Sequence, residues 1–560
     1  MKDSTDKIAA RSTEVMLGPN PIVGMRARDV AREGLKALGL AARQPRLTAR
    51  NARELAGELV KVVQGESDLT PDVRDRRFAD ESWQSNRAYR TWLQSWLAWR
   101  AMTHHWVDAQ DDLSKYGRLR LDFLVDLLND AIAPSNFPWQ PAALKKFRET
   151  GGESAREGLK NFLHDLRKNR GLPSQVDGRK FKVGENLATT EGAVVARTEV
   201  MELIQYQPQT EKVYARPLLI VPPQINKYYV FDLSPEKSLV KGLVEAGYQV
   251  FVVSWRNPGR GHADWGLAEY AAAIESAVSV TCNITHQTRV NMLGACAGGI
   301  TLAAFVAARR AVGDERINSM TLLVNVLDTG ALGDTALGLF AGPRAVEAAK
   351  KVSRRKGVLE GRDMAAAFAW LRPNDLIWNY WVNNVLLGNA PPAFDVLYWN
   401  CDNTRLPARL HEEFLDIYKT NALTQRGQLR LQGVPVDLAQ VNCDSYILGG
   451  TTDHITPWQA CYRSTQLLGG DTTFVLSNSG HIQSILNPPG GKKAEFWHGP
   501  GDHKDPSQWQ AQAQHQDGSW WPHWYAWLGK RSGRKHAAPL ELGNEAYPML
   551  LKAPGTYVFD

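Results

Sequence analysis

No stretch of the sequence is apolar over the roughly 20 residues that a membrane-spanning helix needs, so we expect no transmembrane segment. The opening letters, MKDSTDKIAARSTEVM, contain no apolar core and predict no secretory signal peptide. Cysteine is also scarce. The five cysteines form an odd set in which no two stand at the spacing of metal ligands. This pattern argues against a disulfide scaffold and a metal site, and it is typical of a cytoplasmic protein.

Positive charge is present but not concentrated. The formal net charge is +7, and the lysines and arginines nowhere form a block with interleaved aromatic residues. This distribution argues against a nucleic-acid partner but is compatible with an anionic one, such as a phosphate-bearing substrate or a membrane surface. Hydrophobic residues make up 43% and charged residues 22% of the 560 positions, which predicts a folded protein with more than one domain.

The first third of the chain has a helical pattern. Apolar residues recur at helical spacing in ARELAGELVKVV, RTWLQSWLAWRAMTHHWV and RLDFLVDLLNDAI. The tryptophans of the second stretch lie roughly on one face, which suits either a domain core or a docking face for a partner. A turn-rich segment between about 172 and 185 follows. We therefore expect a mainly helical N-terminal domain over residues 1–178.

After this boundary, short apolar runs alternate with helix-like stretches. The runs cover residues 215–223, 248–255, 289–294, 319–328, 444–450 and 472–478. Continuous apolar runs are typical of strands buried on both faces of a parallel sheet, so residues 179–560 predict an α/β domain. The series is interrupted between about 330 and 440, an interval far longer than one βα unit. We interpret this interval as a lid inserted over the sheet.

A candidate nucleophile follows the third run, in the letters NMLGACAGGI. The strand, the small residues and the Ala-rich helix around Cys296 match the nucleophile elbow of α/β-hydrolases, where the turn is too sharp for larger neighbours. Cysteine replaces the serine of that motif. The alternative is a buried structural thiol, which is common for free cysteine. Because a thiol is mostly protonated at neutral pH, a catalytic Cys296 would also need a base.

Candidates for the acid and the base follow the nucleophile in the order that α/β-hydrolases use, each in a loop after a strand. Asp453 comes shortly after the run 444–450, and His481 comes shortly after the run 472–478. Asp328, which also ends an apolar run, is the second candidate for the acid. The sequence therefore predicts a triad of nucleophile, acid and histidine on an α/β-hydrolase fold.

Two backbone N–H groups would stabilise an oxyanion in such a site. One belongs to Ala297, directly after the nucleophile. The other comes from the loop after the first run, where two prolines have no N–H and the first available donors are Gln224 and Ile225. His454, next to the acid, is a candidate for hydrogen bonding within the site and to the substrate.

These residues and the motifs around them resemble a polyhydroxyalkanoate (PHA) synthase of class II, the pseudomonad type. The resemblance covers essentially the whole chain from about 180 to 490, and the N-terminal domain is also similar. It rests on long stretches: PPQINKYYVFDLSPEKSLV, VSWRNP, GACAGG, LRPNDLIWNYWVNN, FDVLYWN, TRLP, DHITPW and SNSGHIQSILNPPG. One departure is small, because the family often has Ser where this chain has Ala297, whose backbone N–H is retained.

The resemblance implies an acyltransferase that polymerises (R)-3-hydroxyacyl-CoA, with a preference for medium chains, and releases CoA. In such an enzyme Cys296 would accept the acyl group, Asp453 would be the acid and His481 the histidine. Arg372 and Trp399 match positions that the family uses around the substrate channel and lid. The resemblance also implies no cofactor beyond the CoA of the substrate. It further implies a homodimer in the cytoplasm, on granules of growing PHA that other granule-associated proteins share.

Two other interpretations stay open. A cysteine-type esterase, thioesterase or PHA depolymerase would have the same fold and would transfer the acyl group to water, although depolymerases more often carry serine at the elbow. A non-catalytic protein could bind a granule or lipid surface through its Trp-rich helices. Release of free 3-hydroxy acid without polymer would favour the first, and binding without any release of CoA would favour the second.

Overall fold

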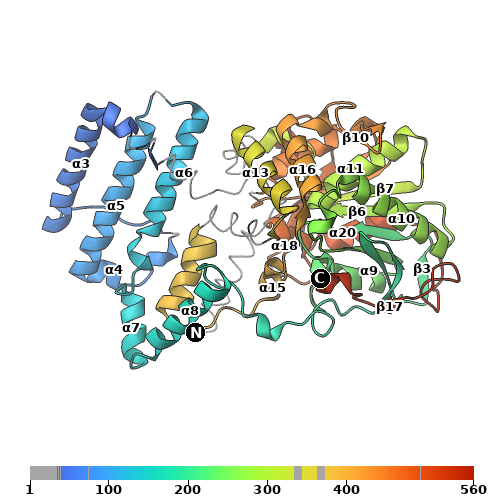
Figure 1. Ribbon diagram of the computed structural model, residues 1–560, viewed down its shortest axis with the longest axis horizontal. Coiled ribbons are helices and arrows are strands. Elements are labelled where there is room, and N and C mark those ends of the chain that lie inside the picture. Colours follow the sequence, from blue (N-terminus) through green and yellow to red (C-terminus); the bar gives the residue numbers. More distant parts are fainter. Residues whose placement is uncertain are drawn as a thin grey trace. The chain divides into compact units, whose positions relative to one another are not determined.

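The structure is a computed structural model and describes residues 34–332, 343–361, 363 and 373–560, except residues 36, 38, 74, 112, 454 and 492. These residues form two compact units (Figure 1). The first unit contains the described residues up to Asp177 together with those from 373 to Pro392. The second unit contains the described residues from Gly178 to 363 and from Ala393 to Asp560.

The first unit is helical, as the sequence predicts. Its helices are α3 (Pro45–Gln64), α4 (Ser82–Ser85), α5 (Arg87–Asp108), α6 (Lys115–Ala131), α7 (Pro141–Glu149) and α8 (Glu153–Lys168). The side chains of Asn86 and Ser114 accept hydrogen bonds from backbone N–H groups in the first turns of α5 and α6. These caps satisfy donors that have no partner inside the helix, so they fix where the two helices begin.

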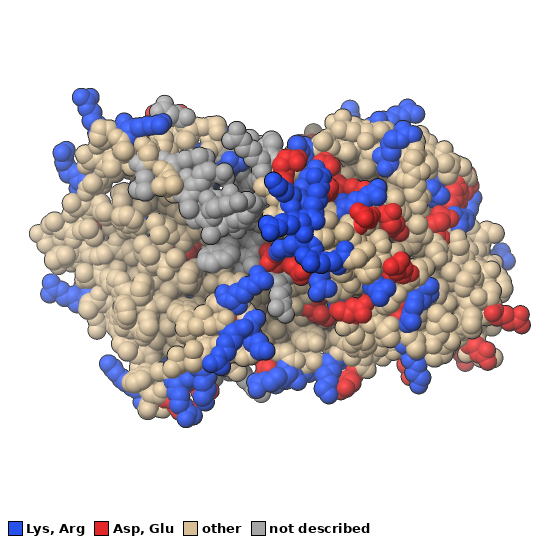
Figure 2. Space-filling view, in the orientation of Figure 1, with Lys and Arg blue, Asp and Glu red and all other residues tan. Residues whose placement is uncertain are grey.

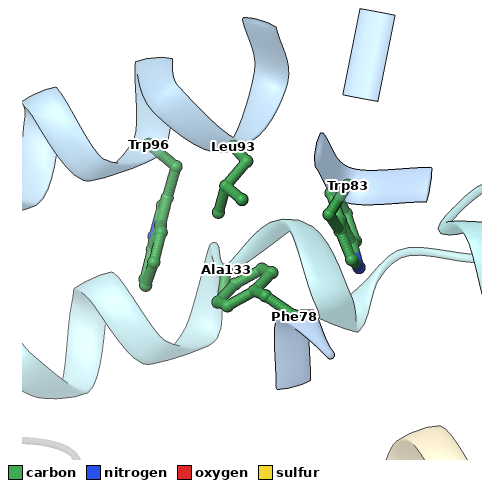
Figure 3. Packing of buried hydrophobic residues seen from close by; sticks show 5 residues of the cluster. All are labelled: Phe78, Trp83, Leu93, Trp96 and Ala133. Atoms are coloured by element: carbon green, nitrogen blue, oxygen red, sulfur yellow. The ribbon is translucent and has the colours of Figure 1, made fainter. Parts of the chain in front are cut away.

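The core of this unit is a cluster of buried apolar side chains around α5: Phe78, Trp83, Leu93, Trp96 and Ala133 (Figure 3). The rings of Trp83 and Trp96 lie against that of Phe78, with centroids 5.3 and 5.4 Å apart. The indole N–H of Trp96 donates to the backbone carbonyl of Asn129 at 3.0 Å. The tryptophan face of α5 is therefore used, at least in part, as a domain core.

Residues 373–392, from the interval that we interpret as a lid, pack in the first unit. They include the π-helical segment η8 (Trp381–Leu386), which lies against α8. Asn161 of α8 donates from Nδ2 to the backbone carbonyl of Asn384 at 2.8 Å. A Cβ at Gly158 would collide with a carbonyl of η8, so the two backbones are in direct contact. The interval is thus divided between the two units.

The second unit is built on an eleven-stranded sheet in the order β15-β14-β13-β12-β7-β6-β4-β5-β2-β1-β17. Its centre is parallel: β4 (Leu218–Val221), β5 (Val250–Trp255), β6 (Val290–Ala295), β7 (Ile317–Leu323), β12 (Asp444–Gly450) and β13 (Thr472–Ser477). These strands confirm the apolar runs predicted as strands. Antiparallel strands flank them: β14 (Glu495–Pro500), β15 (Gln514–Asp517), β2 (Met201–Tyr206), β1 (Gly192–Arg197) and β17 (Leu551–Lys552).

The strand order positions the site. β4 lies between β5 and β6, so the chain order reverses at β4. In such sheets the crevice at the carboxyl ends of the strands around the reversal is the usual place for a ligand. The loops after β4, β6, β12 and β13 all begin at this edge, since the strands are parallel.

Helices connect and flank the strands: α9 (Leu239–Glu245), α10 (Leu267–Thr285), α11 (Cys296–Ala311), α13 (Pro343–Lys356), α15 (Asp395–Cys401), α16 (Ala408–Thr420), α17 (Trp458–Arg463), α18 (His481–Ile485), α19 (Pro506–Gln512) and α20 (Trp521–Gly529). The Trp-rich α20 belongs to the core, because Trp524 is fully buried and its indole N–H donates to the hydroxyl of Thr321 on β7 at 3.0 Å. Among the described residues, no helix combines the length and apolar character of a membrane span.

Candidate active site

The turn between β6 and α11 holds Cys296 in a strained backbone conformation. Its φ is +55°, in the left-handed region that non-glycine residues seldom adopt, at a cost of about 1–3 kcal/mol. Small neighbours permit this turn. A Cβ at Gly298 would lie 2.5 Å from the carbonyl oxygen of Pro222, and a Cβ at Gly294 would lie 2.8 Å from the Cα of Gly299. The local geometry is that of a nucleophile elbow.

Asn325 holds the first peptide of α11 in place, and the sequence pattern did not single it out. Its Nδ2 donates to the backbone carbonyl of Cys296 at 2.7 Å, and the side chain is fully buried. A Cβ at Gly299 would lie 2.8 Å from that Nδ2, so glycine there leaves room for the amide. Asn325 is the second residue after β7, and a polar residue at this place does not by itself identify a contact with the Cys296 carbonyl.

Asp453 and His481 form a buried hydrogen-bonded pair. Nδ1 of His481 lies 2.6 Å from Oδ2 of Asp453, and the two residues are 1% and 4% exposed, respectively. Oδ1 of Asp453 accepts the backbone N–H groups of Ile455 and Thr456, each at 2.9 Å. The hydroxyl of Thr456 donates to Oδ2 at 2.6 Å. Both carboxylate oxygens are therefore held by donors, and the ring orientation follows from them.

Thr456 is a second residue that the sequence pattern did not assign. Its hydroxyl and two backbone N–H groups donate to the carboxylate of Asp453, three positions earlier in the chain. Aspartate side chains commonly form local turns of this kind with the backbone that follows them. The letters DHITPW contained this signal. These three hydrogen bonds hold the carboxylate of Asp453 in addition to its contact with the histidine.

Burial and charge act in opposite directions on this pair. Burial by itself lowers the pKa of His481, but the carboxylate of Asp453 and the nearby Cys296 raise it by more, to about 10 from the ordinary 6.5. Burial likewise raises the pKa of Asp453, whereas His481 and the donors from Thr456 bring it below its ordinary value. The site therefore stabilises an imidazolium next to a carboxylate.

The outer nitrogen of His481 is available for chemistry. Nε2 is buried and has no nitrogen or oxygen partner within the part of the chain that the structure describes. The thiol of Cys296 is close enough to raise the pKa of the same ring, both by charge and by hydrogen bonding. An imidazole that is oriented through Nδ1 and open at Nε2 beside a thiol can accept the thiol proton. The structure thus brings Cys296, Asp453 and His481 together.

Asp328, the second candidate for the acid, is engaged elsewhere. Its Oδ1 accepts from Nδ2 of Asn421 at 2.8 Å, and its Oδ2 lies 3.5 Å from a guanidinium nitrogen of Arg463. No hydrogen bond joins Asp328 to His481 among the described residues. The carboxylate that contacts the histidine is Asp453.

The predicted oxyanion donors lie beside the elbow. Ala297 is in the first turn of α11, where a backbone N–H has no partner inside the helix. Gln224 and Ile225 are each 2% exposed, and their backbone N–H groups make no hydrogen bond to any residue that the structure describes. The side chain of Gln224 donates to the hydroxyl of Thr301 at 3.0 Å, and that hydroxyl donates to the carbonyl of Ala297 at 3.2 Å. These bonds fasten the loop to the start of α11.

The remaining predicted residues have different outcomes. Arg372 and His454 lie outside the described residues. Trp399, on α15, is 2% exposed, and its indole N–H donates to the backbone carbonyl of Lys227 at 2.7 Å. Trp399 therefore contacts the loop that carries Gln224 and Ile225.

An apolar pocket lies next to the candidate catalytic residues. Ala297 and Thr456 form part of its wall, so the pocket adjoins both the neighbour of the nucleophile and the donor to the acid. Most of the other lining side chains are hydrocarbon, including Ile300, Val326, Phe414, Ile417 and Ile455. An acyl chain is a suitable occupant, because it gains about 25 cal/mol per Å² of apolar surface removed from water.

One group of described residues could hold a metal ion. Ligand atoms of Glu495, His515 and Asp517 lie within 4.8 Å of one another on β14 and β15. The Asp517 side chain is 94% exposed. None of the three contacts Cys296, Asp453 or His481, so the group is no part of the site.

This arrangement defines a class of protein, an acyl-transferring enzyme with an α/β-hydrolase fold. A family model described as "alpha/beta hydrolase fold" matches residues 217–488. Another, described as "Poly-beta-hydroxybutyrate polymerase (PhaC) N-terminus", matches residues 74–243. The two matches together extend from the first helical unit into the strand–helix series that carries the site.

Curated relatives extend the likeness to the whole chain. Poly(3-hydroxyalkanoate) polymerase 1 of Ectopseudomonas oleovorans is 50% identical over 557 residues, which cover 100% of this chain and 99% of the relative. Poly(3-hydroxyalkanoate) polymerase 2 of the same organism is 49% identical, and the match covers 100% of this chain and 100% of the relative. The PhaC subunit of Cupriavidus necator is 42% identical over 89% of this chain and 85% of its own. The chain belongs to the poly(3-hydroxyalkanoate) polymerase family.

Proposed function

We propose that this enzyme polymerises (R)-3-hydroxyacyl-CoA into polyhydroxyalkanoate through an acyl group held on Cys296, with release of CoA. Membership of the polymerase family makes it an acyltransferase that forms a polyester. The observation that carries the proposed site is the buried Asp453–His481 pair beside a cysteine in an elbow conformation. A structural thiol would need neither the strained φ nor the open Nε2.

Acylation follows from the contacts of these residues. His481 accepts the proton of Cys296 at Nε2, and the thiolate attacks the thioester carbonyl of the substrate. The N–H of Ala297 and one from the loop after β4 stabilise the oxyanion. The C–S bond to CoA breaks, and the leaving thiolate takes the proton back from His481. Exchange of one thioester for another is nearly isoenergetic, which gives cysteine an advantage over serine at this position.

Chain growth replaces a thioester by an ester. The 3-hydroxyl of one acyl group attacks the thioester carbonyl of another, a C–O bond forms, and the C–S bond breaks. The hydroxyl proton passes through a base to the released thiolate. We assign His481 as this base and Asp453 as its orienting partner, because both oxygens of Asp453 already accept hydrogen bonds.

The apolar pocket supports the choice of hydroxyl over water and of a medium-length acyl chain. Hydrocarbon side chains on α16 and after β7 offer water few partners, whereas they suit an alkyl side chain of the substrate. Exclusion of water would protect the acyl-enzyme from hydrolysis. A hydrolase on the same fold would instead need a path for water to the acylated cysteine.

Positive charge on α13 supports a site for the phosphates of CoA. Figure 2 shows lysine and arginine side chains gathered over this helix. Lys351 and Arg355 are exposed and have no ion pair with any described residue. Arg354 is paired with Glu412 of α16, so α13 packs on the helix that lines the pocket. We propose that the free cations of α13 attract the CoA end of the substrate.

The helical unit offers a surface for the polymer granule. On α8, Leu159, Leu163 and Leu166 recur at helical spacing and are 57%, 41% and 49% exposed. Apolar side chains grouped on one exposed face favour contact with a hydrophobic surface. We propose that this face attaches the enzyme to granules in the cytoplasm. A homodimer is a further proposal that follows from the family resemblance alone.

The test uses the full chain and Cys296→Ala. We expect the native enzyme to release CoA from (R)-3-hydroxyacyl-CoA and to yield polymer, and we expect the variant to do neither. Free 3-hydroxy acid without polymer would instead identify an esterase or thioesterase. Granule binding without CoA release by the native chain would identify a binding protein.

A further inference from the structure

The loop after β4 is fastened along one side by the end of α15 and the residues that follow it. Residues 224–227 and 399–404 run past each other, with an antiparallel bridge between Asn226 and Asn403. The N–H of Thr404 donates to the carbonyl of Ile225 at 3.4 Å. Together with the Trp399 contact to this loop, these bonds make the loop geometry depend on the segment.

The hydroxyl of Thr404 acts on one particular peptide. It donates to the carbonyl oxygen of Gln224 at 2.8 Å, and Thr404 is 2% exposed. That carbonyl and the N–H of Ile225 belong to the same planar peptide unit. In a trans peptide the C=O and the N–H point in opposite directions. A hydroxyl that pulls the carbonyl toward Thr404 therefore directs the Ile225 N–H away from Thr404.

The Ile225 N–H has no partner to satisfy it. The residue is buried, and its N–H makes no hydrogen bond to any residue that the structure describes. A buried donor without an acceptor costs about 1–3 kcal/mol, so such groups are rare unless a ligand or water uses them. The Gln224 side chain and the close approach of Pro222 to Gly298 hold this loop on the elbow.

We propose that Thr404 is a positioning residue that presents the Ile225 N–H, rather than that of Gln224, as the second oxyanion donor beside Ala297. The inference rests on the proposed function, since it assumes that Cys296 is the nucleophile. Thr404 does not touch the reacting atoms. It acts through the peptide 224–225, and the segment 399–404 thereby controls whether the oxyanion site is formed.

The test compares Thr404→Val, which keeps the shape but loses the hydroxyl, with Thr404→Ser, which keeps the hydroxyl. We expect Thr404→Val to lower kcat for acyl transfer by about 10- to 100-fold with little change in KM, since loss of an oxyanion donor costs about 100- to 1,000-fold. Thr404→Ser should restore most of the rate. The full chain is used, with (R)-3-hydroxyacyl-CoA as substrate.

Alkylation of Cys296 by iodoacetamide provides the second readout. This reaction needs the thiolate and His481 but has no oxyanion, so Thr404→Val should be alkylated at the native rate. Equal losses in alkylation and acyl transfer would indicate general damage and overturn the proposal, as would a native kcat in Thr404→Val. If Cys296→Ala stayed active, the proposed function itself would fail, which is a distinct result.

Discussion

The hydroxyl of Thr456 and the imidazole of His481 share one carboxylate oxygen, Oδ2 of Asp453, each at 2.6 Å. The same hydroxyl lies 3.1 Å from Nδ1 of His481, so the three groups form a closed, buried triangle. Hydrogen bonds to a charged group are about twice as strong as neutral ones. The orientation of the His481 ring therefore depends on a threonine as well as on the aspartate.

Thr456→Val removes this hydroxyl and keeps the side-chain shape. We expect acyl transfer to slow by about tenfold, because a lost charge-assisted hydrogen bond costs about 1.5–3 kcal/mol and only part of it bears on ring orientation. Stopped acylation assays that follow CoA release measure this rate. Thr456→Ser retains the hydroxyl and is the control, and a native rate in Thr456→Val would show that the backbone N–H groups alone hold Asp453.

The raised pKa of His481 makes stability depend on pH. The folded protein retains a proton that the unfolded chain releases near pH 6.5, so the stabilisation is complete below 6.5 and is lost as pH rises toward about 10. Asp453→Asn removes the partner. We expect the melting temperature of the native protein to exceed that of Asp453→Asn by a margin that shrinks from about pH 6.5 to about pH 10.

Thermal unfolding across this range measures the margin. The lowered pKa of Asp453 adds no change within it, because that contribution is lost only as pH falls below the ordinary value of 3.8. Asp328→Asn is the control, since that carboxylate contacts Asn421 instead of the histidine. A margin that stayed constant or widened with pH would contradict the assigned direction of the His481 shift.

The apolar runs in the sequence predicted most of the fold and the relative positions of Cys296, Asp453 and His481. Six buried apolar runs placed the parallel strands, and a parallel sheet brings the ends of its strands to one edge. Asp453 and His481 could be selected because each stands just past such an end. Asp453 and His481 lie far from Cys296 along the chain, but the parallel strands that precede the three residues end at the same edge of the sheet.

The lid interval could not be placed by the same reasoning. Helical periodicity shows which face of a helix is apolar, but it does not say which unit that face packs against. The pairing of Asn161 with Asn384 depends on a polar contact between distant segments, which no local pattern contains. Asn325 and Thr404 were missed for the same reason, because each acts through one side-chain hydrogen bond to a backbone carbonyl.

Charge reversal on α13 tests the proposed CoA contact. Lys351→Glu combined with Arg355→Glu should raise KM for the acyl-CoA by about tenfold at low salt and leave kcat nearly native, since exposed cations steer an anionic ligand without touching the reacting atoms. The effect should shrink as salt is added. Arg167→Glu with Lys168→Glu, at the exposed end of α8, is the matched control. A similar rise in KM in both double variants would show that the net charge of the protein, and not the cations of α13, attracts the substrate, and would contradict the proposed contact.

Phe414 sets a wall of the apolar pocket and should influence acyl chain length. It lies on α16 and is 5% exposed. Phe414→Leu enlarges the pocket, so we expect the ratio of kcat/KM for longer over shorter (R)-3-hydroxyacyl-CoA to rise several-fold, given about 0.8 kcal/mol for each buried methylene. Leu415→Val alters the adjacent core position, which is fully buried and does not line the pocket. It should lower stability but keep the ratio. An equal shift in both variants would mean that general loosening of α16, and not the shape of the pocket, selects the acyl chain.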